Sequence, residues 1–146
     1  MLYVFLIVVT LALSAFFSGS EIAFVTANRL RVEVMARRGG VVAPVVQRFL
    51  EDPTTLLTTT LVGNNLALVV YSTLIAFFLE SPLRGLIEVS AGLTGSAADV
   101  IVLSAQTIIG SVVVLVVGEI LPKSIMREIA SRAVFALAIQ IGRAHV

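Results

Sequence analysis

The chain has 146 residues, of which 58% are hydrophobic and 13% charged, and its formal net charge is +1. A soluble domain carries about 25% charged residues, so this composition indicates a membrane protein, and the small net charge gives no sign of nucleic-acid binding. The sequence has no cysteine, which excludes disulfides and thiolate metal sites.

The first apolar segment runs from Leu2 to about residue 28. About 20 apolar residues suffice to cross ~30 Å of hydrocarbon. A cleaved signal peptide would carry basic residues before its apolar core, whereas the first basic residue here is Arg29, so a membrane span is expected. Ser14, Ser18 and Glu21 follow a four-then-three spacing and share one helix face. Ser14 is interpreted as donating to the carbonyl four residues earlier.

The first loop, residues 29–52, is rich in arginine and also carries regularly spaced apolar residues. This pattern predicts a helical hairpin, or an amphipathic surface helix, broken at Gly39 and Gly40.

A second span is predicted from about Thr54 to Leu79, with Gly63, Asn64 and Asn65 inside it. The asparagines are either hydrogen-bonding contacts between helices or ligands of a bound ion. The next segment, residues 80–99, is rich in glycine and serine and is expected to be irregular.

A third span is predicted from about Val100 to Leu121, with Glu119 near its end and Pro122 directly after it. Its other small and polar residues are interpreted as a packing face. They are Gln106, Thr107, Gly110 and Ser111.

Residues 124–140 then predict an amphipathic belt helix on the inner membrane surface. Residues 141–146 match a translated sequencing adapter, so we expect them to be non-native and Arg143 and His145 to have no role. The predicted fold is therefore an all-α membrane domain of residues 1–140. It has three transmembrane helices, a helical hairpin in the first cytoplasmic loop and a juxtamembrane belt helix.

Basic residues concentrate in the first loop and after the third span. By the positive-inside rule, the N-terminus lies outside and the C-terminus in the cytoplasm. This topology places Ser18, Asn64 and Glu119 in the inner half of the membrane, where they are able to converge.

These polar residues offer hydroxyl, amide and carboxylate oxygens, which are the ligands of hard cations such as Mg²⁺ and Ca²⁺. Pro122 has no N–H and would free the carbonyl of Gly118 as a further ligand. The spans hold no histidine, cysteine or nucleophile–base pair, so an enzyme is not expected. The sequence therefore predicts a site for a hard divalent cation such as Mg²⁺ or Ca²⁺, and the family resemblance given next favours Mg²⁺.

Three phrases in chain order strengthen this interpretation: SGSEIAF at 18–24, LVGNNLA at 61–67 and GEILPKS at 118–124. Together they resemble the transmembrane domain of the CorC/CorB and cyclin M (CNNM) family, also labelled hemolysin-C-like. The resemblance covers about residues 1–140.

The resemblance implies a homodimeric Mg²⁺ transporter of the cell (inner) membrane, generally an exporter, with Na⁺ as a candidate coupling ion and alternating access as the mechanism. CBS domains normally follow this domain and are absent from this sequence. Carried over by motif, Ser18, Asn64 and Glu119 would be cation ligands. Leu68 and Val69 stand where many relatives have a polar residue.

Further ligands implied in second rank are Ser20, Glu21, Asn65 and the carbonyl of Gly118. Two other functions remain open at this point. One is a membrane Mg²⁺ sensor that regulates another transporter, and the other is a structural dimerisation module.

Overall fold

The described residues of the computed structural model, 1–37, 44, 46 and 51–143, form a bundle of long helices. Three helical segments are long and apolar enough to cross a membrane: Leu2–Thr26, Pro53–Ala91 and Ser96–Ala130. The predicted all-α class with three candidate spans is confirmed.

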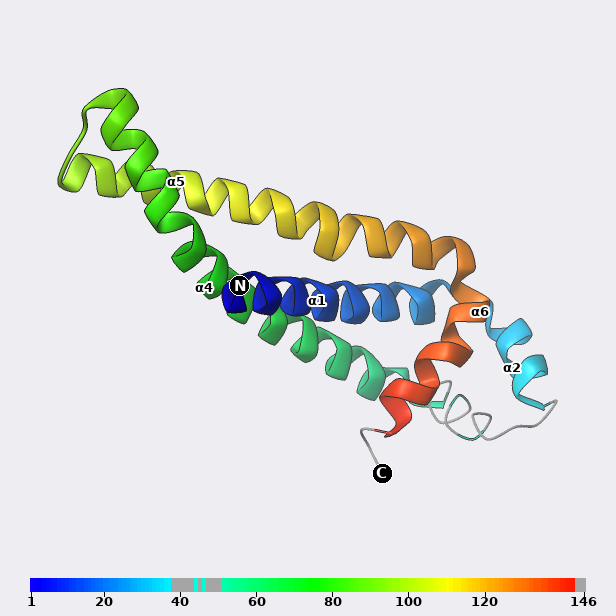
Figure 1. The fold of residues 1–146 in the computed structure, drawn as a ribbon. Coiled ribbons are helices and arrows are strands. Elements are labelled where there is room, and N and C mark those ends of the chain that lie inside the picture. The colour runs from blue at the N-terminus through cyan, green and yellow to red at the C-terminus, as the bar shows by residue number, and fades with distance from the viewer. Residues whose placement is uncertain (38–43, 45, 47–50, 144–146) are drawn as a thin grey trace.

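Helix α1 (Leu2–Thr26) lies between α4 (Pro53–Ala91) and the third membrane helix (Figure 1). It packs against α4, against η1 (Val114–Ile120) and against α6 (Leu121–Arg143). Most of the side chains that α1 buries are small or polar, and they follow a three- and four-residue spacing. They are Ile7, Thr10, Ser14, Ser18, Gly19, Ser20 and Ala23.

Capping residues stand at both ends of helix α4. The Asp52 carboxylate accepts from the backbone N–H groups of Thr54 and Thr55, and Pro53 occupies the first turn. At the far end, Gly92 adopts φ +63°, a left-handed conformation that ends helices and that glycine adopts without steric cost.

The prediction of an irregular segment at 80–99 is wrong. Helix α4 continues through Pro82 to Ala91, and α5 (Ser96–Val113) begins soon after the turn at Gly92. The Arg84 side chain donates to the Asp99 carboxylate at 2.8 Å and so ties α4 to α5. Of the glycines here, Gly92 and Gly95 lie between the two helices and take positive φ, whereas Gly85 lies inside α4.

The third membrane helix contains a π-helical segment that the sequence did not predict. In η1, the Leu121 N–H bonds the Val116 carbonyl, five residues back. The buried positions of α5 recur every four residues, which exceeds the 3.6 residues of one turn, so the buried stripe drifts around the helix. The wider π turn reverses this drift and returns the stripe to Gly118.

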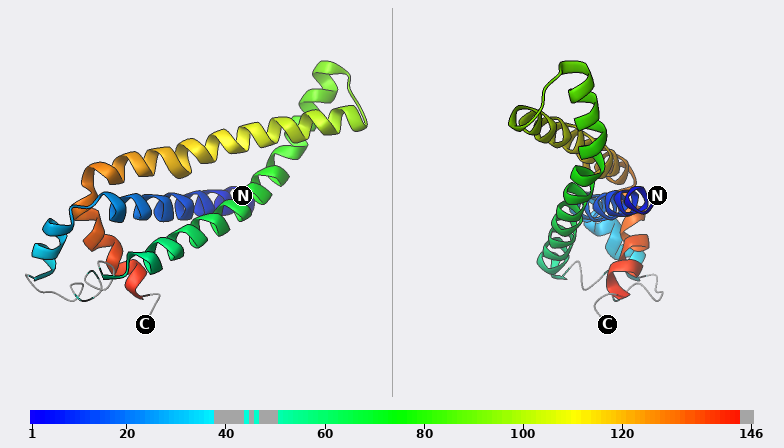
Figure 2. Two further views of the ribbon diagram at one scale, coloured as in Figure 1. Left: turned by 180° about the vertical axis from the view of Figure 1, so that it is seen from behind. Right: turned by 60° about the vertical axis from the view of Figure 1, so that its left-hand side comes forward.

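The chain turns near the start of α6 and then runs across the Thr26 end of α1 (Figures 1 and 2). A π segment and a proline, Pro122, lie next to each other at this point, and both are known causes of helix kinks. On α6, Ala133 and Met126 pack with Ala23 of α1. A helix is therefore present where the belt helix was predicted, and it begins at Leu121 instead of residue 124, while its place on the membrane surface stays a prediction.

Helix α2 (Arg29–Arg37) confirms that the first loop begins with a helix. The predicted break at Gly39 and Gly40 lies outside the described residues, as does most of the second arm of the hairpin.

Candidate cation site

Residues of the second and third motifs meet α1 at Ser14, where α4 and η1 both pack against this helix. The Ser14 hydroxyl of α1 donates to the Asn64 side-chain carbonyl of α4 at 2.8 Å. A Cβ atom placed on Gly118 of η1 would lie 3.1 Å from the same Ser14 oxygen. We term this meeting point of Ser14, Asn64 and Gly118 the three-helix junction. It brings the second and third motifs to the same residue of α1, while the convergence of Ser18, Asn64 and Glu119 themselves stays a prediction.

The interpretation of Ser14 as a residue bonded within its own helix is wrong. Its side chain is fully buried, and its hydroxyl bonds the amide of the neighbouring helix. The Asn64 amide is partly buried, and Ser14 supplies its oxygen with a donor across the helix interface. The sequence therefore did not predict this contact of Ser14 with α4. The signal that could have found it was the helix face that it shares with Ser18 and Glu21.

Ser18 lies one turn from Ser14, toward the Thr26 end of α1. Its hydroxyl oxygen is buried and has no hydrogen-bond partner among the described residues. Leaving a buried polar group unpaired costs about 1–3 kcal/mol, so such a group is a candidate for binding something that the protein itself does not supply. Of the residues predicted as first-rank ligands, Ser18 is the one whose environment most resembles that of a ligand.

The second-rank residues have different surroundings. The Ser20 hydroxyl donates to the Phe16 carbonyl at 2.6 Å, so its proton is already engaged within α1. Asn65 is exposed on α4, while Glu21 is partly buried. Their roles as ligands stay predictions.

Gly118 and Glu119 lie inside the π segment, where the ordinary pattern of backbone hydrogen bonds is shifted. Gly118 is buried and Glu119 is partly buried. Pro122 has no N–H, and in an α-helix that N–H would bond the Gly118 carbonyl. π-Helical turns frequently occur at functional sites. The local backbone is therefore suited to presenting main-chain oxygen next to a carboxylate.

Glycines set how closely the helices approach around the junction. A Cβ on Gly63 would lie 2.6 Å from the Phe17 ring, and one on Gly19 would lie 2.9 Å from Met126 Cγ. Small residues that let backbones approach are typical of packed membrane helices.

Comparison with known proteins identifies the family to which this domain belongs. Residues 5–143 match the family described as the cyclin M transmembrane N-terminal domain. The chain is 38% identical over 113 residues to the UPF0053 inner membrane protein YfjD of Escherichia coli. The aligned residues make up 77% of this chain and 23% of that protein. It is also 38% identical over 61 residues to a UPF0053 protein of Haemophilus influenzae, covering 42% of this chain and 14% of that one.

The chain thus spans less than a quarter of the length of these relatives. The family match, in contrast, extends over nearly all of the chain, including the three motifs and the three-helix junction. This chain belongs to the cyclin M (CNNM) transmembrane-domain family.

Proposed function

We propose that this chain is the membrane-spanning part of a divalent-cation transporter that exports Mg²⁺ by alternating access. The observation that carries the proposal is the junction of Ser14, Asn64 and Gly118, with the unpartnered hydroxyl of Ser18 one turn away. Mg²⁺ prefers oxygen ligands in a near-octahedral arrangement and gives up its water reluctantly, so several protein oxygens must converge on it.

In this proposal Ser18, Asn64 and Glu119 bind the ion directly. Ser14 acts through Asn64, because its hydrogen bond fixes the amide and uses only one of the two lone pairs of the carbonyl oxygen. The other lone pair is free to face a cation. The Gly118 carbonyl, Glu21, Ser20 and Asn65 would complete or support the ligand set.

The proposed setting is the inner membrane, with the N-terminus outside and the site in the inner half of the bilayer. The name of the Escherichia coli relative includes the words inner membrane protein. A homodimer and coupling to Na⁺ belong to the same proposal, and no enzymatic activity is assigned to the chain.

The direct test is Mg²⁺ efflux from cells loaded with Mg²⁺. Glu119→Gln removes the charge with little change of shape and is expected to abolish efflux. Glu128→Gln is the matched control, since Glu128 is exposed on α6, away from the junction, and efflux should be unchanged. Unchanged efflux in a well-expressed Glu119→Gln variant would contradict the proposal.

A structural dimerisation module is the second candidate, and the Ser14–Asn64 bond bears on it because such bonds hold the helices of one chain together without a bound ion. Thermal unfolding in detergent separates the two functions. A cation site predicts that Mg²⁺ raises the unfolding temperature and that Glu119→Gln removes the effect. A purely structural domain predicts no dependence on Mg²⁺. Flux in reconstituted liposomes then separates a transporter from a sensor.

A further inference from the structure

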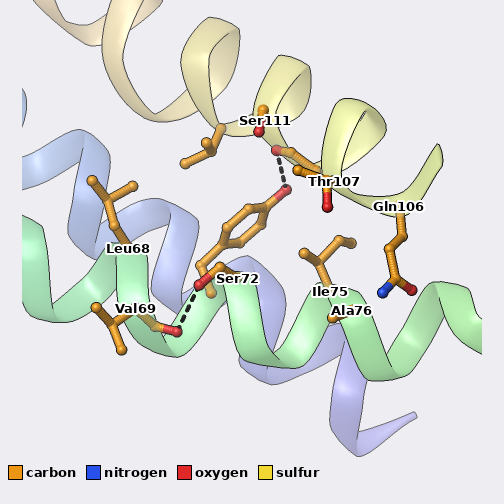
Figure 3. A pocket seen from close by; sticks show the side chains of 11 residues that line it. Leu68, Val69, Ser72, Ile75, Ala76, Gln106, Thr107 and Ser111 are labelled. Carbon is orange, nitrogen blue, oxygen red and sulfur yellow. Dashed lines mark hydrogen bonds between the residues drawn. The ribbon is translucent and has the colours of Figure 1, made fainter. Parts of the chain in front are cut away.

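Tyr71 of α4 bonds the third membrane helix just before the π segment begins (Figure 3). The side chain is 1% exposed, and its hydroxyl donates to the Gly110 carbonyl at 3.1 Å. A Cβ atom placed on Gly110 would lie 3.1 Å from Ile75 of α4. The two helices are therefore in close contact at this point, beside a cavity of about 360 Å³ that Tyr71 also lines.

The Gly110 carbonyl belongs to the α-helical turn that directly precedes η1. The Val114 N–H bonds this carbonyl, four residues back, as in an ordinary α-helix. At the far end of η1, the Leu121 N–H bonds Val116, five residues back. The Tyr71 hydroxyl thus binds the backbone where the α-helical pattern gives way to the π-helical one.

The π segment decides which residue of the third helix faces α1. A π turn holds one residue more than an α-turn, and each residue of an α-helix advances about 100° around the axis. If η1 became α-helical while α5 stayed in place, Val117 would take the position of Gly118 opposite Ser14. A Cβ atom at that position lies 3.1 Å from the Ser14 oxygen, so the larger valine does not fit there. The Glu119 carboxylate would turn away as well.

π-Helical turns are rare, so the surrounding structure must favour this one. Pro122 follows its end and has no N–H, which removes one of the α-helical bonds that would compete with the π pattern. The bond from Tyr71 stands before its start. Two interactions that flank η1 therefore help to set where the π segment lies.

We propose that Tyr71 is a positioning residue of the cation site, which fixes the start of the π segment and thereby the direction of Gly118 and Glu119. Tyr71 is seven residues beyond Asn64 along α4, about 10 Å at 1.5 Å per residue, and lies outside the proposed ligand set. The proposal rests on the proposed function and extends it to a residue that acts through the third helix.

Tyr71→Phe keeps the ring and removes the hydroxyl. We expect isothermal titration of the purified protein in detergent to show Mg²⁺ binding that is about fivefold weaker, the factor that corresponds to one ordinary hydrogen bond. Thr107→Val is the matched control, since it removes a hydroxyl beside the same cavity that bonds Leu103 within α5. Its Mg²⁺ binding should be unchanged.

A one-residue deletion distinguishes positioning from a general loss of stability. Leu115 is half exposed within η1, and its deletion converts η1 into an α-helical segment in which Gly118 and Glu119 keep their direction. The deletion variant should bind Mg²⁺ as the wild type does. Adding Tyr71→Phe to the deletion should then have no further effect, because no π segment is left to position.

A cysteine introduced into η1 reports the direction of the helix without any cation, because the chain has no cysteine of its own. Val117 is 44% exposed, so Val117→Cys should react with N-ethylmaleimide. Tyr71→Phe should slow this reaction by the same factor by which it weakens Mg²⁺ binding, since residue 117 then turns toward Ser14. Thr107→Val should leave the rate unchanged.

An unchanged rate of Val117→Cys labelling in Tyr71→Phe would overturn the proposal. Weaker Mg²⁺ binding that persists when Tyr71→Phe is combined with the deletion would also overturn it, and if the deletion variant fails to fold, the labelling rate decides alone. If the wild type binds no Mg²⁺ at millimolar concentration while Tyr71→Phe slows the labelling, the proposed function fails, whereas the control of η1 by Tyr71 stands.

Discussion

The three-helix junction and the cavity between α4 and α5 (Figure 3) share α4 and the third membrane helix, yet their helices lie at different separations. At the junction, Gly63 and Gly118 let the helices approach until a serine and an asparagine bond each other. At the cavity, the hydroxyl of Tyr71 bonds a backbone carbonyl and Gln106 keeps an unpaired oxygen. Glycine therefore permits the close approach at the junction, whereas larger side chains such as Tyr71 and Gln106 line the cavity.

The difference has a chemical consequence. Closely approaching helices exclude water and suit an ion that gives up its water for protein oxygens. The two regions are joined by η1, which begins one turn after Gly110, the residue that accepts from Tyr71. The following variants test this contrast.

The largest effect on stability is expected from Gly63→Ala, which places a methyl group 2.6 Å from the Phe17 ring. Overpacking of this kind costs about 1–3 kcal/mol. Gly85→Ala on the same helix is the control, because its Cβ would meet nothing within 4 Å. Thermal unfolding in detergent should show a lower midpoint for the first and an unchanged or higher midpoint for the second. Equal midpoints would show that the junction is not tightly packed.

A smaller effect is expected from Tyr71→Phe, which removes the hydroxyl bond to the Gly110 carbonyl. A typical buried hydrogen bond contributes about 1 kcal/mol. The same carbonyl also accepts from the Val114 N–H, where the π segment begins. Hydrogen exchange should therefore become faster at the amides of η1 and stay unchanged in the first half of α1. Unchanged hydrogen exchange in η1 would show that the Tyr71 bond at the cavity does not stabilise the π segment beside the junction.

The coupling between Ser14 and Asn64 is expected to be smaller again. Hydrogen bonds between membrane helices average about 0.6 kcal/mol in double-mutant cycles. Ser14→Ala, Asn64→Leu and the double variant should give a coupling energy of about this size from their unfolding free energies. A coupling energy near zero would mean that the 2.8 Å bond does not hold α1 to α4.

The smallest effect concerns the start of α4. The hydroxyl of Thr55 and the backbone amides of Thr55 and Thr54 hold the pKa of Asp52 below its ordinary value of 3.8. A lowered folded-state pKa stabilises the first turn above pH 3.8 and ceases to do so as the pH falls through the lowered value. After correction for intrinsic rates, exchange at the Thr54 and Thr55 amides should increase in that acidic range. Asp52→Asn keeps the cap and should remove the pH dependence.

The local sequence predicted the membrane spans correctly but did not predict where the helices end. The apolar runs predicted three membrane helices correctly. The segment at 80–99 misled, because glycine and serine suggested a loop, whereas Arg84 and Asp99 join two helix ends into a hairpin. The sequence was likewise insufficient for Ser14. A serine in a helix bonds either a carbonyl of its own helix or a group on a neighbouring helix, and the position of the neighbouring helix determines which bond forms.

The sequence by itself determined the membrane class, the three spans and, through three ordered motifs, the family. These follow from the length of the apolar runs and from residue types in order, which need no knowledge of helix packing. Only the tertiary structure showed the bond from Ser14 to Asn64, the π segment at Val114–Ile120 and the cavity around Gln106. Each of these depends on how two helices cross, and crossing is set by contacts between residues far apart in the chain.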